Sequence, residues 1–321
     1  RCRMETIEGI GETKSIVLKL VILAVVLCFF SLLSAVRAGA QDKDTAVFVQ
    51  SRTAQPVSLE TMLGDLASYN VVVFGEFHDS QPIHDAELAV LKGLYRQHGA
   101  NLALSMEMFE RDVQPVMNDY LAGKITEGEF LAASRPWPQY KTAYKPLVEY
   151  AKAHHIPVLT GNIPRRIAAT YAKSKTLDSI ADEDKQYLPN VHRAGSAAYR
   201  EKFAAVMQGM NTMPGGMKIP PQMVQPMFMA QCLKDDTMAE SIIQYRQQYP
   251  QAVVYHVVGN FHSAGHLGMA EKMAWLQPKT RIAVIDTVHY EKHKDTIRDI
   301  AQANASGGDY LALETAHHEV K

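Results

Sequence analysis

The segment Val71–His78 reads Val-Val-Val-Phe-Gly-Glu-Phe-His, and a counterpart at His256–His262 reads His-Val-Val-Gly-Asn-Phe-His. Each is an apolar run of strand length that ends at a glycine, where a chain can turn sharply. Polar side chains that can bind ligands follow at once. In an open parallel sheet, functional groups gather at the carboxyl ends of strands. We therefore expect these two strand ends to meet and form one site.

Along the rest of the chain, apolar runs of strand length alternate with amphipathic helical stretches. This alternation predicts an α/β fold with a mostly parallel central sheet flanked by helices. Pro157 fits only near the start of a strand or on an edge strand. The predicted strands are residues 71–74, 102–106, 156–160, 252–258 and 281–285, and the predicted helices are residues 83–97, 111–122, 146–154 and 233–247.

Residues 111–150 and 165–245 are too helical and too long to be simple crossover connections. We expect them to form a smaller helical lobe over the carboxyl end of the sheet. Residues 207–229 hold seven methionines, with Pro214-Gly215-Gly216 and Pro220-Pro221 between them. Two interpretations stay open for this segment: a loop whose apolar residues pack irregularly, or a flexible cover over an apolar ligand.

The first forty residues have the layout of a secretory leader, because basic residues precede an apolar run that ends at small residues 38–40. We expect residues 1–40 to be a signal peptide, or an uncleaved anchor, since the run approaches the lower limit of about 17 residues for a membrane span. Cys28 follows Leu27 inside the apolar run, which disfavours a lipoprotein. The protein is thus expected to be exported, and periplasmic or membrane-associated, with residues 41–321 as its α/β domain.

Without the leader, 28 basic and 31 acidic residues remain, which gives a net charge of −3. No basic stripe dominates, so the sequence does not indicate nucleic-acid binding. Cys232 is then the one remaining cysteine, which excludes an internal disulfide and a thiolate cluster for a metal ion.

Each predicted strand end carries a polar side chain, and buried carboxylates and imidazoles are costly unless they are paired or coordinated. Two histidines and two glutamates suit a divalent ion such as zinc, with a carboxylate left to act as a base. Asn162 could instead cap the helix that begins at Pro164. His84, six residues after His78, could join the cluster or face solvent after Pro82, and we favour the solvent-facing position. The polar groups in strand order are Glu76, His78, Glu107, Asn162, Asn260, His262 and Asp286.

An ordered set of motifs resembles the ChaN-type proteins of the haem-binding uptake and Tiki superfamily. The resemblance covers roughly residues 60–290 and implies an exported α/β protein that binds haem in iron acquisition. It also implies a homodimer in which two haems stack face to face, each iron held by a tyrosine. The motifs are those at residues 73–78, 105–109, 137 with 144–147, 157–164, 231–239 and 259–262.

The segment from Arg135 to Lys145 has features that a haem site needs, namely aromatic faces, two phenols and three cations. A tyrosinate is a hard anionic donor that suits ferric iron. The alternative is a helix-entry loop whose aromatic residues anchor the helical lobe. The candidate haem residues are Tyr144 as the best match to the family position, Tyr140 in reserve, Trp137, and Arg165 and Arg166 as partners of the propionates.

We therefore expect an exported haem-binding protein that pairs around its ligand, with an outer-membrane haem receptor as a candidate partner. A metal-dependent hydrolase of peptides or esters is the alternative, since wider relatives such as Tiki proteases and erythromycin esterases use Gly-X-X-His and Glu motifs. A third alternative is an exported interaction protein whose polar strand ends stabilise turns. The hydrolase would use Glu76, His78, Glu107 and His262, supported by Asn162, Asn260 and His84.

Overall fold

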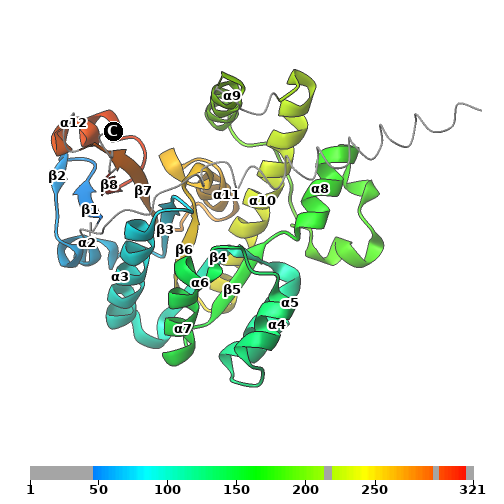
Figure 1. Ribbon diagram of the computed structural model, residues 1–321, viewed down its shortest axis with the longest axis horizontal. Coiled ribbons are helices and arrows are strands. Elements are labelled where there is room, and N and C mark those ends of the chain that lie inside the picture. Colours follow the sequence, from blue (N-terminus) through cyan, green and yellow to red (C-terminus); the bar gives the residue numbers. More distant parts are fainter. Residues whose placement is uncertain (1–45, 213–218, 292–295, 316–321) are drawn as a thin grey trace, which may run out of the picture. The chain divides into compact units, whose positions relative to one another are not determined.

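The structure, a computed structural model, describes residues 46–212, 219–291 and 296–315. The predicted leader, residues 1–40, lies outside this range. Within the described range, eight strands form one sheet in the order β2-β1-β8-β7-β3-β6-β4-β5 (Figure 1). The strands are β1 Val47–Gln50, β2 Gln55–Pro56, β3 Val71–Glu76, β4 Leu102–Glu110, β5 Val158–Asn162, β6 Val253–Gly259, β7 Ile282–Tyr290 and β8 Tyr310–Thr315.

Parallel pairing joins the six strands from β8 to β5, whereas β1 runs antiparallel to both β2 and β8. The predicted α/β fold with a mostly parallel sheet is confirmed. All five predicted strands are present as β3 to β7 and begin within two residues of the predicted starts. Pro157 directly precedes β5, which lies at the edge of the sheet, as the sequence predicted.

Helices connect the strands, and none of those that the structure describes is both long and apolar enough to cross a bilayer. The predicted helices correspond to α3, α4, α7 and the second half of α10. The helices are α2 Leu59–Leu66, α3 Gln81–His98, α4 Gln114–Leu121, α5 Glu127–Ser134, α6 Tyr140–Ala143, α7 Lys145–Ala153, α8 Arg165–Ser174, α9 Ala197–Thr212, α10 Pro221–Gln248, α11 Met269–Leu276 and α12 Ile297–Ala303.

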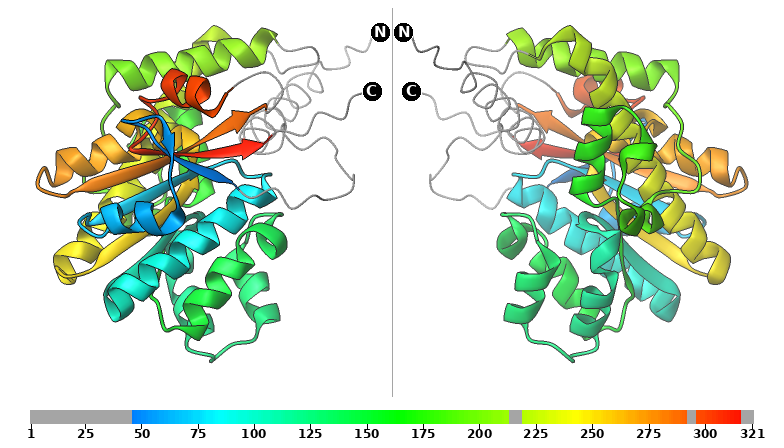
Figure 2. Two further views of the ribbon diagram at one scale, coloured as in Figure 1. Left: turned by 90° about the vertical axis from the view of Figure 1, so that its left-hand side faces the viewer. Right: turned by 90° about the vertical axis from the view of Figure 1, so that its right-hand side faces the viewer.

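Helices cover both faces of the sheet (Figure 2). On one face, Val71 and Val73 of β3 join a core with residues of α10 and α11, including Met238 and Met273. On the other face, the hydroxyl of Tyr255 in β6 donates to a backbone carbonyl of α3. Because successive residues of a strand point to opposite faces, the core residue Val254 and its neighbour Tyr255 place α10 and α3 on opposite sides.

The described parts of the two stretches predicted to form a helical lobe, residues 111–150 and 165–245, are mostly helical. Ile167 of α8 and Leu233 of α10 belong to a separate small core, as a lobe requires. The second half of α10, from Met238 onward, instead packs against the sheet. The lobe is therefore continuous with the main core through this one long helix.

The methionine-rich segment is mostly helical, so its interpretation as a loop is wrong for the described part. Residues 207–212 end α9, and residues 221–229 begin α10. Met207 is buried, whereas Met223 and Met227 are partly exposed. Residues 213–218 lie outside the described residues.

Helix α3 is held close to α2 by a glycine. The Ser80 hydroxyl caps α3 by accepting the Ile83 N–H at 3.3 Å. Further along, a Cβ atom added to Gly93 would lie 2.2 Å from Cδ1 of Leu63, a buried residue of α2. The absence of a side chain at this position therefore sets how closely the two helices approach.

Gly93→Ala is expected to lower the free energy of unfolding by about 1–3 kcal/mol, because overpacking must displace Leu63. Gly64 is the matched control, since it lies in α2 with no atom within 4 Å of an added Cβ. Gly64→Ala should raise stability by about 0.5–1 kcal/mol, because alanine loses less backbone entropy on folding. Urea unfolding curves measure both changes, and equal effects at the two sites would contradict the packing argument.

Candidate functional site

The ends of β3, β6 and β4 lie side by side in the sheet. Strand β3 pairs with β6 in parallel, with Glu76 opposite Gly259, and β6 pairs in turn with β4. A Cβ atom added to Gly259 would lie 2.9 Å from Nε2 of His78 and 3.4 Å from Oε2 of Glu107. The two sequence segments therefore meet at one site, as predicted from their pattern.

The glycines of the two segments do not turn the chain sharply, so that prediction is wrong. Gly75 lies inside β3, and Gly259 ends β6 with a φ of −53°. Both glycines instead leave room for close neighbours. A Cβ atom at Gly75 would lie 2.9 Å from Cα of Asn260, and one at Gly259 would strike the His78 ring.

Glu76, His78 and Tyr144 form a hydrogen-bonded group. Oε1 of Glu76 is hydrogen-bonded to Nδ1 of His78 and accepts the Tyr144 hydroxyl at 2.9 Å. The Tyr144 oxygen also lies 3.3 Å from Nδ1 of His78. The tyrosine predicted to bind haem and two of the residues predicted to bind a metal ion therefore belong to one cluster.

Solvent reaches this group mainly at one residue. Tyr144 is 0% exposed and Glu76 is 1% exposed, whereas the His78 side chain is 22% exposed. Burial alone would raise the pKa of Glu76, but His78 and His84 hold it well below its usual value. Burial and the charge of Glu76 raise the pKa of Tyr144 far above 10. Tyr144 is therefore a neutral phenol in this arrangement.

His84 is buried, so the prediction that it faces solvent is wrong. Its Nδ1 lies 3.1 Å from a carboxylate oxygen of Glu76 and 3.1 Å from one of Glu87. Burial opposes protonation of His84, but the hydrogen bonds to these carboxylates raise its pKa to about 11. The sequence reasoning missed Glu87. The spacing of three residues between His84 and Glu87 places both on one helix face and could have revealed the pair.

Glu107 and His262 form the second acid–base pair of the site. Nε2 of His262 lies 3.3 Å from Oε1 of Glu107, and Nδ1 lies 2.6 Å from Oδ1 of Asp235. Oε2 of Glu107 accepts the Gly259 N–H at 2.8 Å. Burial opposes both charges, but their mutual attraction lowers the pKa of Glu107 to about 2 and raises that of His262 to about 9. The sequence reasoning also missed Asp235.

The supporting residues Asn162 and Asn260 lie on different sides of the cluster. Asn162 donates to the carbonyl oxygen of Glu107 at 2.9 Å and so ties the end of β5 to β4. It does not cap α8, whose N-cap residue is Pro164. Asn260 lies beside Asp286, which is in the middle of β7 and not at a strand end as the sequence predicted. Burial raises the pKa of Asp286 to about 7, while Lys202 and Asn260 oppose the rise.

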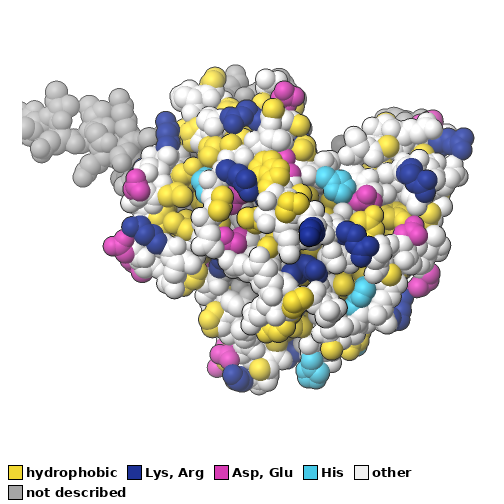
Figure 3. Space-filling model, turned by 180° about the vertical axis from the view of Figure 1, so that it is seen from behind, with side chains coloured by type: hydrophobic (Ala, Val, Ile, Leu, Met, Phe, Trp, Pro, Cys, Tyr) yellow, Lys and Arg dark blue, Asp and Glu magenta, His cyan; other side chains and the backbone are white. Residues whose placement is uncertain are grey.

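Trp137 connects the cluster to a pocket lined by arginines. Its ring stands edge-on to His78 with centroids 5.0 Å apart, and the Arg165 guanidinium lies 5.5 Å from the Trp137 ring centroid. The pocket is lined by Glu110, Arg135, Arg165 and Arg166. On the face drawn in Figure 3, basic and acidic side chains are interspersed among apolar ones.

Tyr140, the reserve haem ligand, lies in an aromatic group. Its ring centroid is 6.2 Å from that of Phe109 and 6.0 Å from that of Phe130. All three side chains are buried. This environment matches the alternative interpretation, in which the segment anchors the helices around it.

Residues 62–273 match the family described as haem-binding uptake, Tiki superfamily, ChaN. The chain belongs to this family. The chain is similar to the structure of ChaN from Campylobacter jejuni with cofacial haem, with a TM-score of 0.64 and 15% sequence identity. The alignment covers 85% of this chain and 98% of the Campylobacter jejuni chain. A mutant erythromycin esterase, EreC, in its open conformation has a TM-score of 0.46 at 12% identity, covering 77% of each chain. No curated protein matches the sequence.

These comparisons confirm the family resemblance inferred from the motifs. The matched range of 62–273 lies within the predicted range of 60–290 and includes the two glutamates and both histidines of the strand ends. At 15% identity, the likeness to the Campylobacter jejuni protein shows a shared fold. In this chain the cluster lies where β3, β4 and β6 approach their carboxyl ends.

His262→Gln tests the charge pairing through the pH dependence of stability. Because its folded pKa is about 9 and its ordinary value is 6.5, His262 stabilises the fold fully below pH 6.5 and loses this effect as pH rises through 9. The stability difference between wild type and variant should shrink by up to about 3 kcal/mol between pH 6 and pH 9. Urea unfolding at the two pH values measures it, and a constant difference would refute the pairing.

Proposed function

We propose that this protein binds haem and serves in haem or iron uptake. The description of its family and the haem bound by the Campylobacter jejuni relative support this proposal. The observation that carries it is the contact between the predicted haem residues. The Trp137 ring stands edge-on to both His78 and Tyr144, and Arg165 lies over the same ring.

The residues around Trp137 fit the chemical needs of haem. The indole ring offers an apolar face, and guanidinium groups bind carboxylates such as propionates through paired hydrogen bonds. The nearby arginines are already oriented by carboxylates, since Arg166 donates to Asp112 and Asp184 at 2.6 Å each. When bound, haem would supply a ferric iron that accepts an oxygen ligand.

We infer that Tyr144 is the iron ligand, as its match to the family position suggested. Its hydroxyl donates to Oε1 of Glu76, which is also hydrogen-bonded to His78, so the Glu76–His78 pair is positioned to take the phenolic proton when the oxygen binds iron. Because Tyr144 is fully buried, iron can reach it only if side chains that cover it move aside, and Trp137 and His78 are among those in contact with it.

Tyr171 is a second tyrosine that could lose its proton to a histidine. Its hydroxyl lies 2.9 Å from Nε2 of His192, whose Nδ1 lies 2.9 Å from Oδ2 of Asp236. The carboxylate holds the Nδ1 proton in place, so Nε2 accepts the hydrogen bond from the phenol. The sequence reasoning did not identify this chain of hydrogen bonds, which makes Tyr171 the natural comparison for Tyr144.

We further propose that two copies of the chain pair around haem and that the protein is exported to the periplasm or to a membrane. The cofacial haem of the Campylobacter jejuni relative supports the pairing. The leader layout of residues 1–40 supports export. We propose an outer-membrane haem receptor as a partner, because an exported protein in the periplasm could contact it.

The alternative function, a metal-dependent hydrolase, has weaker geometric support. The four residues predicted to hold its ion form two pairs, Glu76 with His78 and Glu107 with His262. Among the residues that the structure describes, the group close enough to hold an ion is instead Glu76, His84 and Glu87. The four predicted ligands therefore do not make up the group with metal-binding distances, which leaves the haem function better supported.

Hemin titration of wild type, Tyr144→Phe and Tyr171→Phe tests the haem proposal. Wild type should give a saturable, red-shifted Soret band. Tyr144→Phe should lose the charge-transfer features of a tyrosinate ligand and bind at least about tenfold more weakly, a loss of 1.4 kcal/mol. Tyr171→Phe should leave both unchanged.

The reverse pattern in the two variants would assign the ligand to Tyr171. Absence of saturable hemin binding by wild type would overturn the haem function itself. Light scattering during the same titration tests the pairing, because the measured mass should double as haem binds. A mass that stays constant at saturation would contradict the pairing of two copies around haem.

A further inference from the structure

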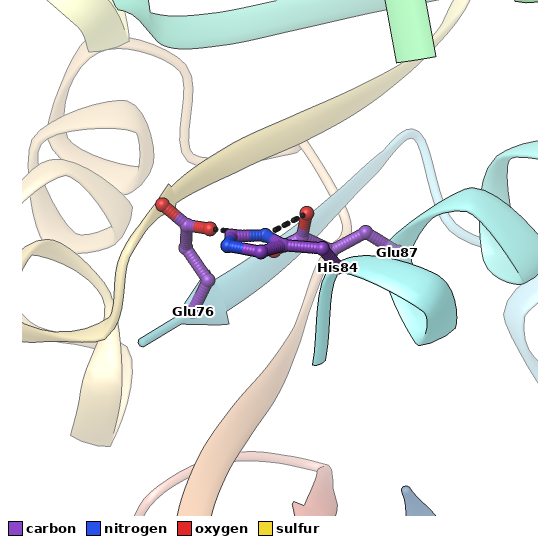
Figure 4. A group of neighbouring side chains, drawn as sticks. All are labelled: Glu76, His84 and Glu87. Atoms are coloured by element: carbon purple, nitrogen blue, oxygen red, sulfur yellow. Dashed lines mark hydrogen bonds and ion pairs between the residues drawn. The ribbon is translucent and has the colours of Figure 1, made fainter. Parts of the chain in front are cut away.

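Glu76, His84 and Glu87 form a compact buried group at the junction of β3 and α3. Each offers an oxygen or nitrogen atom, and these atoms all lie within 4.8 Å of one another. The His84 ring lies between the two carboxylates (Figure 4). The exposed fractions are 1% for Glu76, 5% for His84 and 0% for Glu87. Two carboxylates this deeply buried need a positive partner.

The hydrogen bonds of His84 determine which of its nitrogens faces the carboxylates. Nε2 lies 3.2 Å from the carbonyl oxygen of His78, which can only accept, so Nε2 carries a hydrogen. Nδ1 is left 3.1 Å from Oε2 of Glu76 and 3.1 Å from Oε2 of Glu87. One nitrogen therefore faces two acceptor oxygens.

A single proton on Nδ1 cannot satisfy both oxygens. The contact with Glu87 has hydrogen-bond geometry, whereas the equally short contact with Glu76 does not. Among the described residues, Oε2 of Glu76 and Oε1 of Glu87 are both buried without a hydrogen-bond partner. A buried carboxylate oxygen left in this way is costly, and one imidazolium at His84 balances only one of the two carboxylates, which points to a divalent cation in place of the Nδ1 proton.

The two distances from Nδ1 of His84 suit a divalent ion bound by these three atoms. With metal–ligand bonds of about 2.0 Å, tetrahedral ligands lie about 3.3 Å apart. Both 3.1 Å separations from Nδ1 are close to this value. A histidine that binds a metal ion also usually donates its other ring N–H to a backbone carbonyl or carboxylate, as His84 does to His78.

We propose that Glu76, His84 and Glu87 bind a divalent transition-metal ion such as zinc, through Nδ1 of His84 and one oxygen of each carboxylate. Imidazole with two carboxylates is a donor set that zinc accepts, and two carboxylates neutralise its charge. The ion fastens the end of β3 to the first turns of α3. It also fixes Glu76, whose other oxygen accepts the Tyr144 hydroxyl.

This site differs from the metal set that the sequence predicted, with which it shares Glu76. His84 and Glu87 lie on α3, outside the Gly-Glu-Phe-His and Gly-Asn-Phe-His segments. The binding of a metal ion here does not depend on haem, so the two proposals can fail separately.

Metal analysis of the full chain after equilibration with zinc and dialysis tests the site. Wild type should retain one zinc ion per chain, and Co²⁺ in its place should give the visible absorption of a tetrahedral site. Glu87→Gln keeps the side-chain shape, removes a charged ligand and should weaken binding at least about tenfold. Asp85→Asn is the matched control, because it removes a carboxylate charge from the exposed side of the same helix, and it should bind zinc as wild type does.

Two outcomes would overturn the proposal. One is that wild type retains no stoichiometric ion and that EDTA leaves its melting temperature unchanged. This result concerns wild type alone, so it overturns the metal site even where Glu87→Gln does not fold. The other is that His262→Gln loses the ion while Glu87→Gln keeps it, which would move the metal to the Glu107 pair. Hemin binding by Glu87→Gln, measured in parallel, shows whether the haem proposal stands independently.

Discussion

The site depends on the parallel pairing of β3 with β6 and on the missing side chain at Gly259. This pairing places Glu76 opposite Gly259, and the ring of His78 occupies the space where a Cβ atom would be. The same glycine donates its N–H to Glu107. A larger residue would push His78 away from Glu107 and would separate the two acid–base pairs.

Charge pairing inside this small volume sets the chemistry of the site. Burial raises the cost of every ionised group, so each carboxylate is held by an imidazole: Glu76 by His78 and His84, and Glu107 by His262. A second layer fixes the imidazoles, since Asp235 binds His262 and the His78 carbonyl binds His84. The residues of the site are therefore oriented before any ligand arrives.

The haem and metal proposals use adjoining parts of this network. Tyr144 and Trp137 extend it toward the pocket of Arg135, Arg165 and Arg166, whereas His84 and Glu87 extend it into α3. Glu76 belongs to both parts, because one of its oxygens accepts the tyrosine hydroxyl and the other faces His84. An ion bound beside His84 would thus fix the carboxylate on which the tyrosine depends.

The sequence by itself determined five of the six parallel strands, the meeting of the two segments and the family, because buried parallel strands are continuous apolar runs that end at polar residues. It did not reveal β8, whose apolar run Leu311–Leu313 is too short to be distinctive and is a strand through pairing with β1 and β7. It also misplaced His84 and missed Glu87 and Asp235. Only the tertiary structure decided these, since the packing of α3 on the sheet buries His84 and Glu87, and α10 brings Asp235 to His262 from a distant part of the chain.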